Sequence, residues 1–182
     1  MDIGGGSVEF ILANKDSIFF SKSYPVGAAV LLKDFHQSDP VSEEEIERMH
    51  RHFEVILADL FEAAGKFPPQ ALAGASGSFD TIGEILFFPK TEAELYAASD
   101  YVKVWESDFS RVYDQLIKTI LEQRLKLQGL LPLRADLIVV SVVLIKFILD
   151  KLEIKEIFLS NYALKEGLLK RIISGKINVA AP

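Results

Sequence analysis

The alternation of apolar and polar residues predicts a β-hairpin near the start of the chain. Residues 7–13 (SVEFILA) and 17–24 (SIFFSKSY) have the composition of strands. Asn14-Lys15-Asp16 between them is typical of a turn, and Pro25-Val26-Gly27 is expected to end the hairpin.

Helical spacing then dominates residues 42–65. Ser42, with Glu45 three residues later, matches a capping box, and apolar residues recur every three or four positions as far as Gly65. We expect one helix here. The acidic run at 43–47 is interpreted as the solvated N-terminus of this helix, which the helix dipole favours, rather than as a metal site.

The rest of the chain continues to alternate strands and helices. The pattern predicts a strand at 71–75, a helix at 79–87, a long helix at 99–127 with a break near Ser107, an apolar helix at 134–152, a strand at 154–159 and a helix at 164–173 with Gly175 as its C-cap. Tyr101, Trp105 and Phe109, at i, i+4 and i+8, are expected to form a core stripe of the long helix. The whole order indicates an α/β domain.

Composition limits the classes of function. With 182 residues, 49% of them hydrophobic, the chain suits one globular domain. A net charge of −6 argues against a broad nucleic-acid surface. The absence of cysteine excludes disulfides and thiol catalysis and is compatible with a cytoplasmic protein. The most apolar segment, 137–149, is too short for a membrane span, and we expect neither a membrane partner nor a signal peptide.

The histidines offer little chemistry. His50 and His52 are two residues apart and would lie on different faces of a helix, so a helical metal pair is not expected. We interpret them as exposed helix residues.

Two glycine-containing loops carry the candidate chemistry. In Asp2-Ile3-Gly4-Gly5-Gly6-Ser7, bare backbone N–H groups can converge on an anion, Ser7 adds a hydroxyl, and Asp2 can hold a divalent cation that the anion also binds. Residues 74–78 (GASGS) form the second loop. Both follow strands, and ligands of open α/β sheets bind at the carboxyl ends of strands, so we expect the loops to share one crevice. A flexible linker is the alternative interpretation of residues 4–7, and a simple tight turn is the alternative for residues 74–78.

Five segments in order resemble a known family. DIGGGSVEF, SYPVGAAVL, GASGSFDTI, LRADLI and LSNYALKEGLL occur in the order seen in the exopolyphosphatase and guanosine pentaphosphate phosphohydrolase family, which is part of the actin-like ATPase superfamily. The resemblance implies a ribonuclease-H-like domain, with a mixed sheet flanked by helices and with extra helices inserted between residues 90 and 130.

The resemblance also implies an activity. Family members have two such domains with the active site between them, and residues 1–182 resemble the second domain alone. The whole protein would use Mg²⁺ to release terminal orthophosphate from polyphosphate or guanosine pentaphosphate. The missing first domain would supply an Asp-bearing phosphate loop and the carboxylate that activates water, so we expect little turnover by this chain alone.

Roles transfer to this sequence residue by residue. The resemblance makes Asp2 and Glu9 catalytic residues that organise metal and water. Strand alternation places Glu9 on the same face as Ser7. Phosphate would be held by the following residues: Gly4, Gly5, Gly6, Ser7, Gly74, Ser76, Gly77 and Arg134. The chain departs from the family at 137–141 and 160–163, which both lack the usual glycine.

Two other functions remain open. The chain could be a non-catalytic module that binds polyphosphate or nucleotide and closes against a partner. It could also be an actin-like or sugar-kinase half-domain that binds ATP, although no clear purine pocket is evident. Surface bared by a missing domain also promotes association, so a homodimer is expected.

Overall fold

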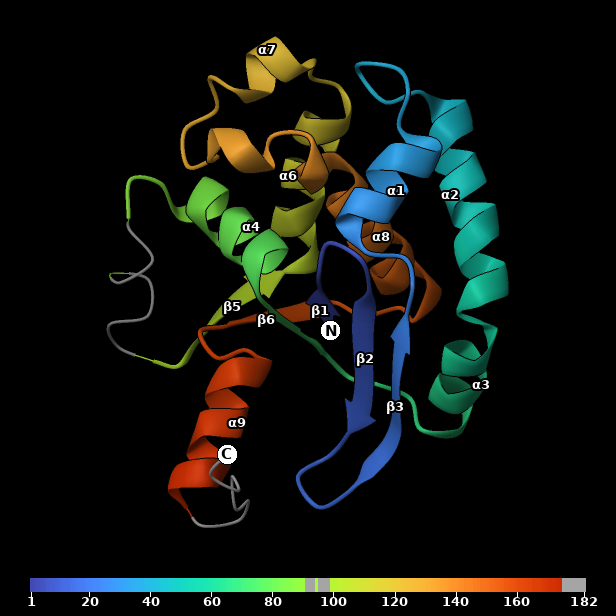
Figure 1. The fold of residues 1–182 in the computed structure, drawn as a ribbon, viewed down its shortest axis with the longest axis vertical. Coiled ribbons are helices and arrows are strands. Elements are labelled where there is room, and N and C mark those ends of the chain that lie inside the picture. Colours follow the sequence, from blue (N-terminus) through green and yellow to red (C-terminus); the bar gives the residue numbers. More distant parts are fainter. Residues whose placement is uncertain (91–93, 95–98, 175–182) are drawn as a thin grey trace, which may run out of the picture.

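The computed structural model describes residues 1–90, 94 and 99–174. Its strands form one mixed sheet in the order β3-β2-β1-β4-β6-β5 (Figure 1). The strands are β1 (Asp2–Ile3), β2 (Val8–Ala13), β3 (Ile18–Tyr24), β4 (Leu72–Ala75), β5 (Tyr101–Trp105) and β6 (Glu156–Ser160). The helices are α1 (Ala28–Phe35), α2 (Glu43–Ile56), α3 (Ala58–Lys66), α4 (Gly77–Phe87), α6 (Glu106–Ile117), α7 (Leu121–Arg124), the 3₁₀ helix η1 (Pro132–Arg134), α8 (Leu137–Lys151) and α9 (Leu164–Ile173).

Strand pairing confirms the predicted hairpin. The strands β1, β2 and β3 are antiparallel neighbours, whereas β1, β4 and β6 run parallel and β5 returns antiparallel to β6. Parallel neighbours need crossover connections, and helices supply them here. This mixed sheet with flanking helices has the predicted α/β architecture.

The two faces of the sheet differ. Ile3, Val8, Phe10 and Leu159 point into the core, where α8 packs against α1, α2, α4 and α6. The segment 138–145 of α8 is fully buried, which explains its uninterrupted apolar run. Among the described residues, no helix combines the length and apolarity needed to cross a bilayer.

Two predicted helices are wrong in detail. Residues 101–105 form strand β5, and Tyr101 and Trp105 are about half exposed rather than part of a core stripe. The period-2 alternation of YVKVW also fits a strand, and pairing with β6 stabilises the strand, from which Val104 reaches the core. The single helix predicted for 42–65 is two helices, separated at Leu57, where φ is −100° and ψ is 12°.

The histidine prediction is also wrong. His50 and His52 are half-buried rather than exposed. The ring of His50 lies 5.1 Å from that of Phe147, and burial lowers the pKa of His50. The predicted C-cap Gly175 lies outside the described residues.

The capping box is confirmed, but one of its acids is not solvated. The Ser42 hydroxyl accepts from Glu45 N–H, and the buried Glu45 carboxylate accepts from Ser42 N–H. Burial alone would raise the pKa of Glu45. Hydrogen bonds from the Ser38 hydroxyl and from the N–H groups of Ser42, Ser38 and Gln37 outweigh burial and bring this pKa to about 2.

The α1 N-terminus supports the glycine loop. A Cβ on Gly27 would lie 2.4 Å from both Gly5 O and Ser7 N, which no real Cβ contact allows. Glycine at this position lets the loop sit directly on the helix start, where Ala28 N–H and Ala29 N–H donate to Gly4 O and Gly5 O, each at 2.9 Å. The loop that carries the candidate chemistry is therefore fixed by main-chain contacts.

We predict that Glu45→Gln lowers the free energy of unfolding at pH 7 by about 3 kcal/mol, because a folded-state pKa far below the unfolded one stabilises the charged protein. This stability is present above the unfolded pKa near 4.5 and is lost as the pH falls towards 2, so the gap between wild type and variant should narrow over that range. Urea unfolding of both proteins at pH 7 and pH 3 measures this difference in the free energy of unfolding. The exposed Glu44→Gln is the control, and an equal effect of both variants would contradict the prediction.

We predict that Gly27→Ala destabilises the protein by several kcal/mol, since the added methyl group would meet backbone that cannot move aside cheaply (about 1–3 kcal/mol for overpacking, and more against main chain). Gly65→Ala in α3 is the matched control. Its Cβ would have nothing within 4 Å, and alanine favours helix by up to about 1 kcal/mol. Thermal and urea unfolding of both variants measure the difference, and equal stabilities would refute the predicted clash.

Candidate active site

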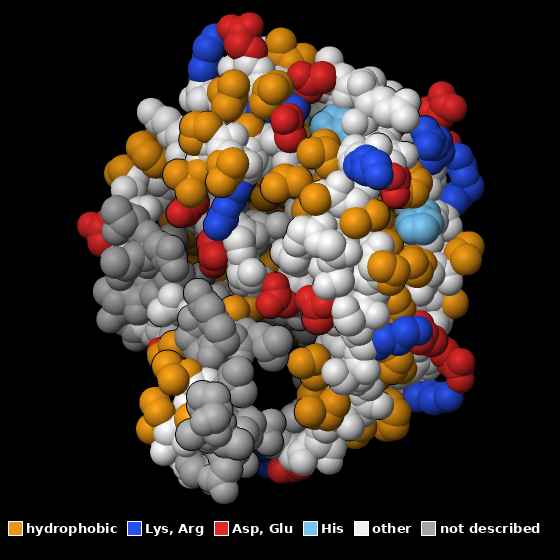
Figure 2. Space-filling model, viewed as in Figure 1, with side chains coloured by type: hydrophobic (Ala, Val, Ile, Leu, Met, Phe, Trp, Pro, Cys, Tyr) orange, Lys and Arg blue, Asp and Glu red, His pale blue; other side chains and the backbone are white. Residues whose placement is uncertain are grey.

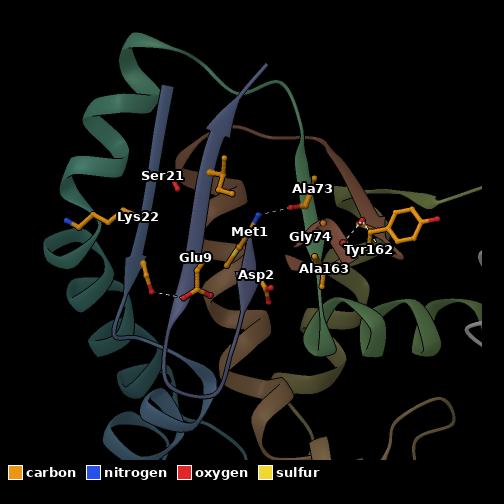
Figure 3. A pocket seen from close by; sticks show the side chains of 14 residues that line it. Met1, Asp2, Glu9, Ser21, Lys22, Ala73, Gly74, Tyr162 and Ala163 are labelled. Atoms are coloured by element: carbon orange, nitrogen blue, oxygen red, sulfur yellow. Dashed lines mark hydrogen bonds between the residues drawn. The ribbon is translucent and has the colours of Figure 1, made fainter. Parts of the chain in front are cut away.

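The β1–β2 hairpin places two carboxylates side by side. Asp2 and Glu9 are register partners of an antiparallel pair, so both side chains leave the same face of the sheet (Figure 3). The hydroxyl of Ser7 donates to Glu9 Oε1 at 2.6 Å, which confirms that Ser7 and Glu9 share a face. The hydroxyl of Ser23 on β3 donates to the same oxygen at 2.6 Å.

The environment of Asp2 opposes its charge. Burial raises the pKa of Asp2, a hydrogen bond from the Ser76 hydroxyl lowers it, and the neighbouring charge of Glu9 raises it again, for a net increase. Two adjacent carboxylates of which one resists ionisation favour the approach of a cation. The pair of carboxylates is therefore suited to binding a cation.

The glycine loop is more ordered than its sequence suggests. Gly4 N–H donates to Ser7 O at 2.9 Å and closes the turn, so Gly4 has no N–H left for an anion. Gly5 and Gly6 are exposed, and their N–H groups donate to no other group in the part of the chain that the structure describes. These two N–H groups remain the candidates for phosphate binding.

The second loop faces the first. Ile3, Gly4 and Gly5 line one cavity of about 250 Å³ together with residues of the second loop and α4. Ser76 precedes α4 and has φ 75° and ψ 172°, a conformation nearly restricted to glycine that costs about 1–3 kcal/mol. The α4 N-terminus behind it carries the partial positive charge that favours anions. The sequence correctly predicted that the two loops would share a crevice.

Gly74 and Arg134 have structural partners. Gly74 is buried inside β4, where a Cβ would lie 2.1 Å from the ring of Phe79, so its bare backbone serves packing. Arg134 Nη1 donates to Gly77 O and, at 2.9 Å, to Thr81 Oγ1. Arg134 thus lies in the small cavity against the first turn of α4, and phosphate binding by both residues stays a prediction.

A larger cavity of about 940 Å³ covers the open face of the sheet, and Asp2 and Glu9 lie on its wall. Figure 3 shows Ala73 and Gly74 from β4, and Tyr162 and Ala163 from the loop before α9, on the side of Asp2 that lies away from Glu9. Asp2 links this cavity to the smaller one through its hydrogen bond from Ser76. Asp2 therefore lies next to Ser76, which lines the smaller cavity together with other phosphate-binding candidates.

Sequence reasoning missed two contacts of the site. Ser23 bonds Glu9 and Ser76 bonds Asp2 by their side chains. The first depends on strand register, which composition does not reveal. No group of three or more metal-ligating His, Asp or Glu side chains occurs in residues 1–90, 94 and 99–174. Two carboxylates nevertheless suit Mg²⁺, which commonly keeps waters and shares the phosphate oxygens of its substrate.

Known proteins are similar to this chain in sequence. The model of the Ppx/GppA phosphatase family matches residues 1–175. A Haemophilus influenzae protein, named as an exopolyphosphatase, is 22% identical over 169 residues, which are 93% of this chain and 50% of that protein.

Solved structures extend the comparison. An exopolyphosphatase from Cytophaga hutchinsonii superposes with a TM-score of 0.88 at 36% identity, over 96% of this chain and 56% of that one. A Ppx/GppA family member from Aquifex aeolicus has the same fold, with a TM-score of 0.80 at 22% identity, over 98% of this chain and 56% of that one. The chain thus spans about half the length of these relatives. Its sheet and helices form the ribonuclease-H-like domain of the actin-like ATPase fold, and the chain belongs to the Ppx/GppA phosphatase family.

Proposed function

We propose that this chain forms one wall of the active site of a phosphoanhydride hydrolase, which releases terminal orthophosphate from polyphosphate or guanosine pentaphosphate with the help of Mg²⁺. The observation that carries the proposal is the pairing of Asp2 with Glu9 beside a glycine loop, which itself shares a cavity with the Ser76–Gly77 loop. Family membership and the exopolyphosphatase relatives support it.

The proposed chemistry divides among the residues. The oxygen of a water molecule forms a bond to the terminal phosphorus as the bridging P–O bond breaks, and the remaining phosphate chain leaves with the bridging oxygen. Gly5 and Gly6 N–H groups donate to phosphate oxygens. Asp2 and Glu9 would hold Mg²⁺, which when bound neutralises charge on the phosphate. The proton of the water passes to a carboxylate base, which the family resemblance assigns to the other domain.

Partners follow from the same proposal. The relatives are about twice as long as this chain, so we propose that a further domain faces Asp2 and Glu9 across a cleft.

The apolar side chains of Ile120, Leu125, Leu131 and Leu133 are exposed around α7 and η1. Figure 2 shows hydrophobic side chains gathered where α7 lies in Figure 1. Exposed patches of this kind promote association, and we keep a homodimer and a cytoplasmic location as proposals.

We predict that Asp2→Asn weakens Mg²⁺-dependent binding of polyphosphate by at least about tenfold, because a metal bound through few protein carboxylates depends on each of them. Without Mg²⁺ the sign should reverse, since removing a negative charge favours an anion. Calorimetric titration of both proteins with polyphosphate, with and without Mg²⁺, measures these affinities. Asp16→Asn, exposed in the β2–β3 turn, is the control. Loss of binding that does not depend on Mg²⁺ would refute the metal role of Asp2.

We predict that the 182-residue chain releases no orthophosphate above background from long polyphosphate or guanosine pentaphosphate, with or without Mg²⁺. One wall cannot exclude water or bring base, metal and phosphate together. Colorimetric phosphate detection checks this. Mg²⁺-dependent release that Glu9→Ala abolishes would mean that residues 1–182 contain all the catalytic carboxylates, and the proposed division between two domains would be wrong.

A further inference from the structure

We infer that Ser23 is a positioning residue that fixes the Glu9 carboxylate for cation binding. The inference rests on the proposed role of Glu9 beside the metal. Ser7 and Ser23 come from different strands and both donate to Glu9 Oε1, each at 2.6 Å. In the part of the chain that the structure describes, no donor reaches Oε2. The two hydroxyls therefore occupy one oxygen and leave the other for a ligand on the side of Asp2.

Strand register explains why a serine stands at this position. The β2–β3 ladder pairs Leu12 with Phe20 but Ala13 with Ile18, so a bulge adds one residue to β3 near the turn. The extra residue turns every later side chain of β3 to the opposite face. Ser23 consequently lies opposite Glu9. In the unshifted register, Lys22 would take that place.

Lys22 at the position opposite Glu9 would have a clear electrostatic effect. An ammonium group beside Glu9 would neutralise the acidic pair and compete with a divalent cation. Instead, Lys22 Nζ lies 2.5 Å from Asp59 Oδ2 on α3, and Tyr24 donates to the same carboxylate at 2.7 Å. In Figure 3, Lys22 points away from Glu9 and Asp2. The bulge thus directs the Lys22 side chain towards α3 and the Ser23 hydroxyl towards Glu9.

A hydroxyl and an ammonium group differ in their effect on the charge of the Glu9 carboxylate. Ser23 orients the carboxylate without cancelling its charge, so the pair of Asp2 and Glu9 stays acidic and ordered. Groups that hold a metal ligand in place typically change metal affinity by about 10–100-fold when they are removed. Because Ser23 is exposed, its loss should leave the fold intact.

Mn²⁺, which is paramagnetic and can replace Mg²⁺, provides the first test on the 182-residue chain. Titration followed by electron paramagnetic resonance should show about tenfold weaker Mn²⁺ binding for Ser23→Ala. Ser23→Thr keeps the hydroxyl and should stay within about twofold of wild type. Ser21→Ala is the matched control, because Ser21 lies on the same strand, lines the same cavity and faces Ile11 rather than an acid. Unchanged Mn²⁺ affinity in Ser23→Ala, with wild-type thermal stability, would overturn the inference.

A metal-free readout separates this inference from the proposed function. Crystal structures of wild type, Ser23→Ala and Ser21→Ala without metal should show the Glu9 carboxylate rotated or spread over several positions only in Ser23→Ala. If wild type binds no Mn²⁺, the proposed metal site fails, and the crystal structures still decide the role of Ser23. A Glu9 carboxylate with the same position in all three structures would overturn the inference.

Discussion

The site depends on one short antiparallel pairing. Strand β1 has two residues, and its register with β2 alone sets Asp2 opposite Glu9. Such a short pair would be unstable if the Gly4–Ser7 turn were free, because glycine loses more conformational entropy on folding than any other residue. The turn is instead held from both sides, by the hydrogen bond from Gly4 to Ser7 and by the N–H groups at the start of α1. The core beneath α1 therefore fixes the geometry of the two acids.

This geometry carries an electrostatic cost that the surrounding hydroxyls only partly offset. Three serines donate to the pair, Ser7 and Ser23 to Glu9 and Ser76 to Asp2, yet the pKa of Asp2 remains raised. Next to Asp2, the backbone of Ser76 adopts a strained conformation with φ 75°. Strain and like charges gathered in one place are typical of sites whose full stability needs a ligand. Under the proposed function, a divalent cation shared with phosphate would satisfy both carboxylates, whereas a lone phosphate would be repelled by them.

Most of the fold could be predicted from the sequence, because strand alternation, turn residues and the Ser42–Glu45 cap are local signals. The errors have physical causes. In β5 the apolar positions fit both a helix and a strand, and only packing against β6 decides between them. The break at Leu57 turns α3 so that Asp59 meets Lys22 and Tyr24, a tertiary effect without a local signal. The sequence alone is enough to predict the glycine loop and its acids as a candidate site. It is not enough to predict Ser23, because one bulge in the ladder decides which face it occupies.

The first turn of α8, where the family resemblance predicts a glycine, contributes to holding the second loop. Where relatives are expected to have glycine, the buried Ser141 hydroxyl donates to Leu137 O and accepts from Ser78, each at 2.9 Å. This contact ties the first turn of α4 to α8, and Arg134 ties the same turn to η1. The Ser76–Gly77 loop is thus anchored in the core, as the glycine loop is through α1. With both loops held by the core, closure over a bound phosphate would come from the surface that faces them, which agrees with the further domain proposed above.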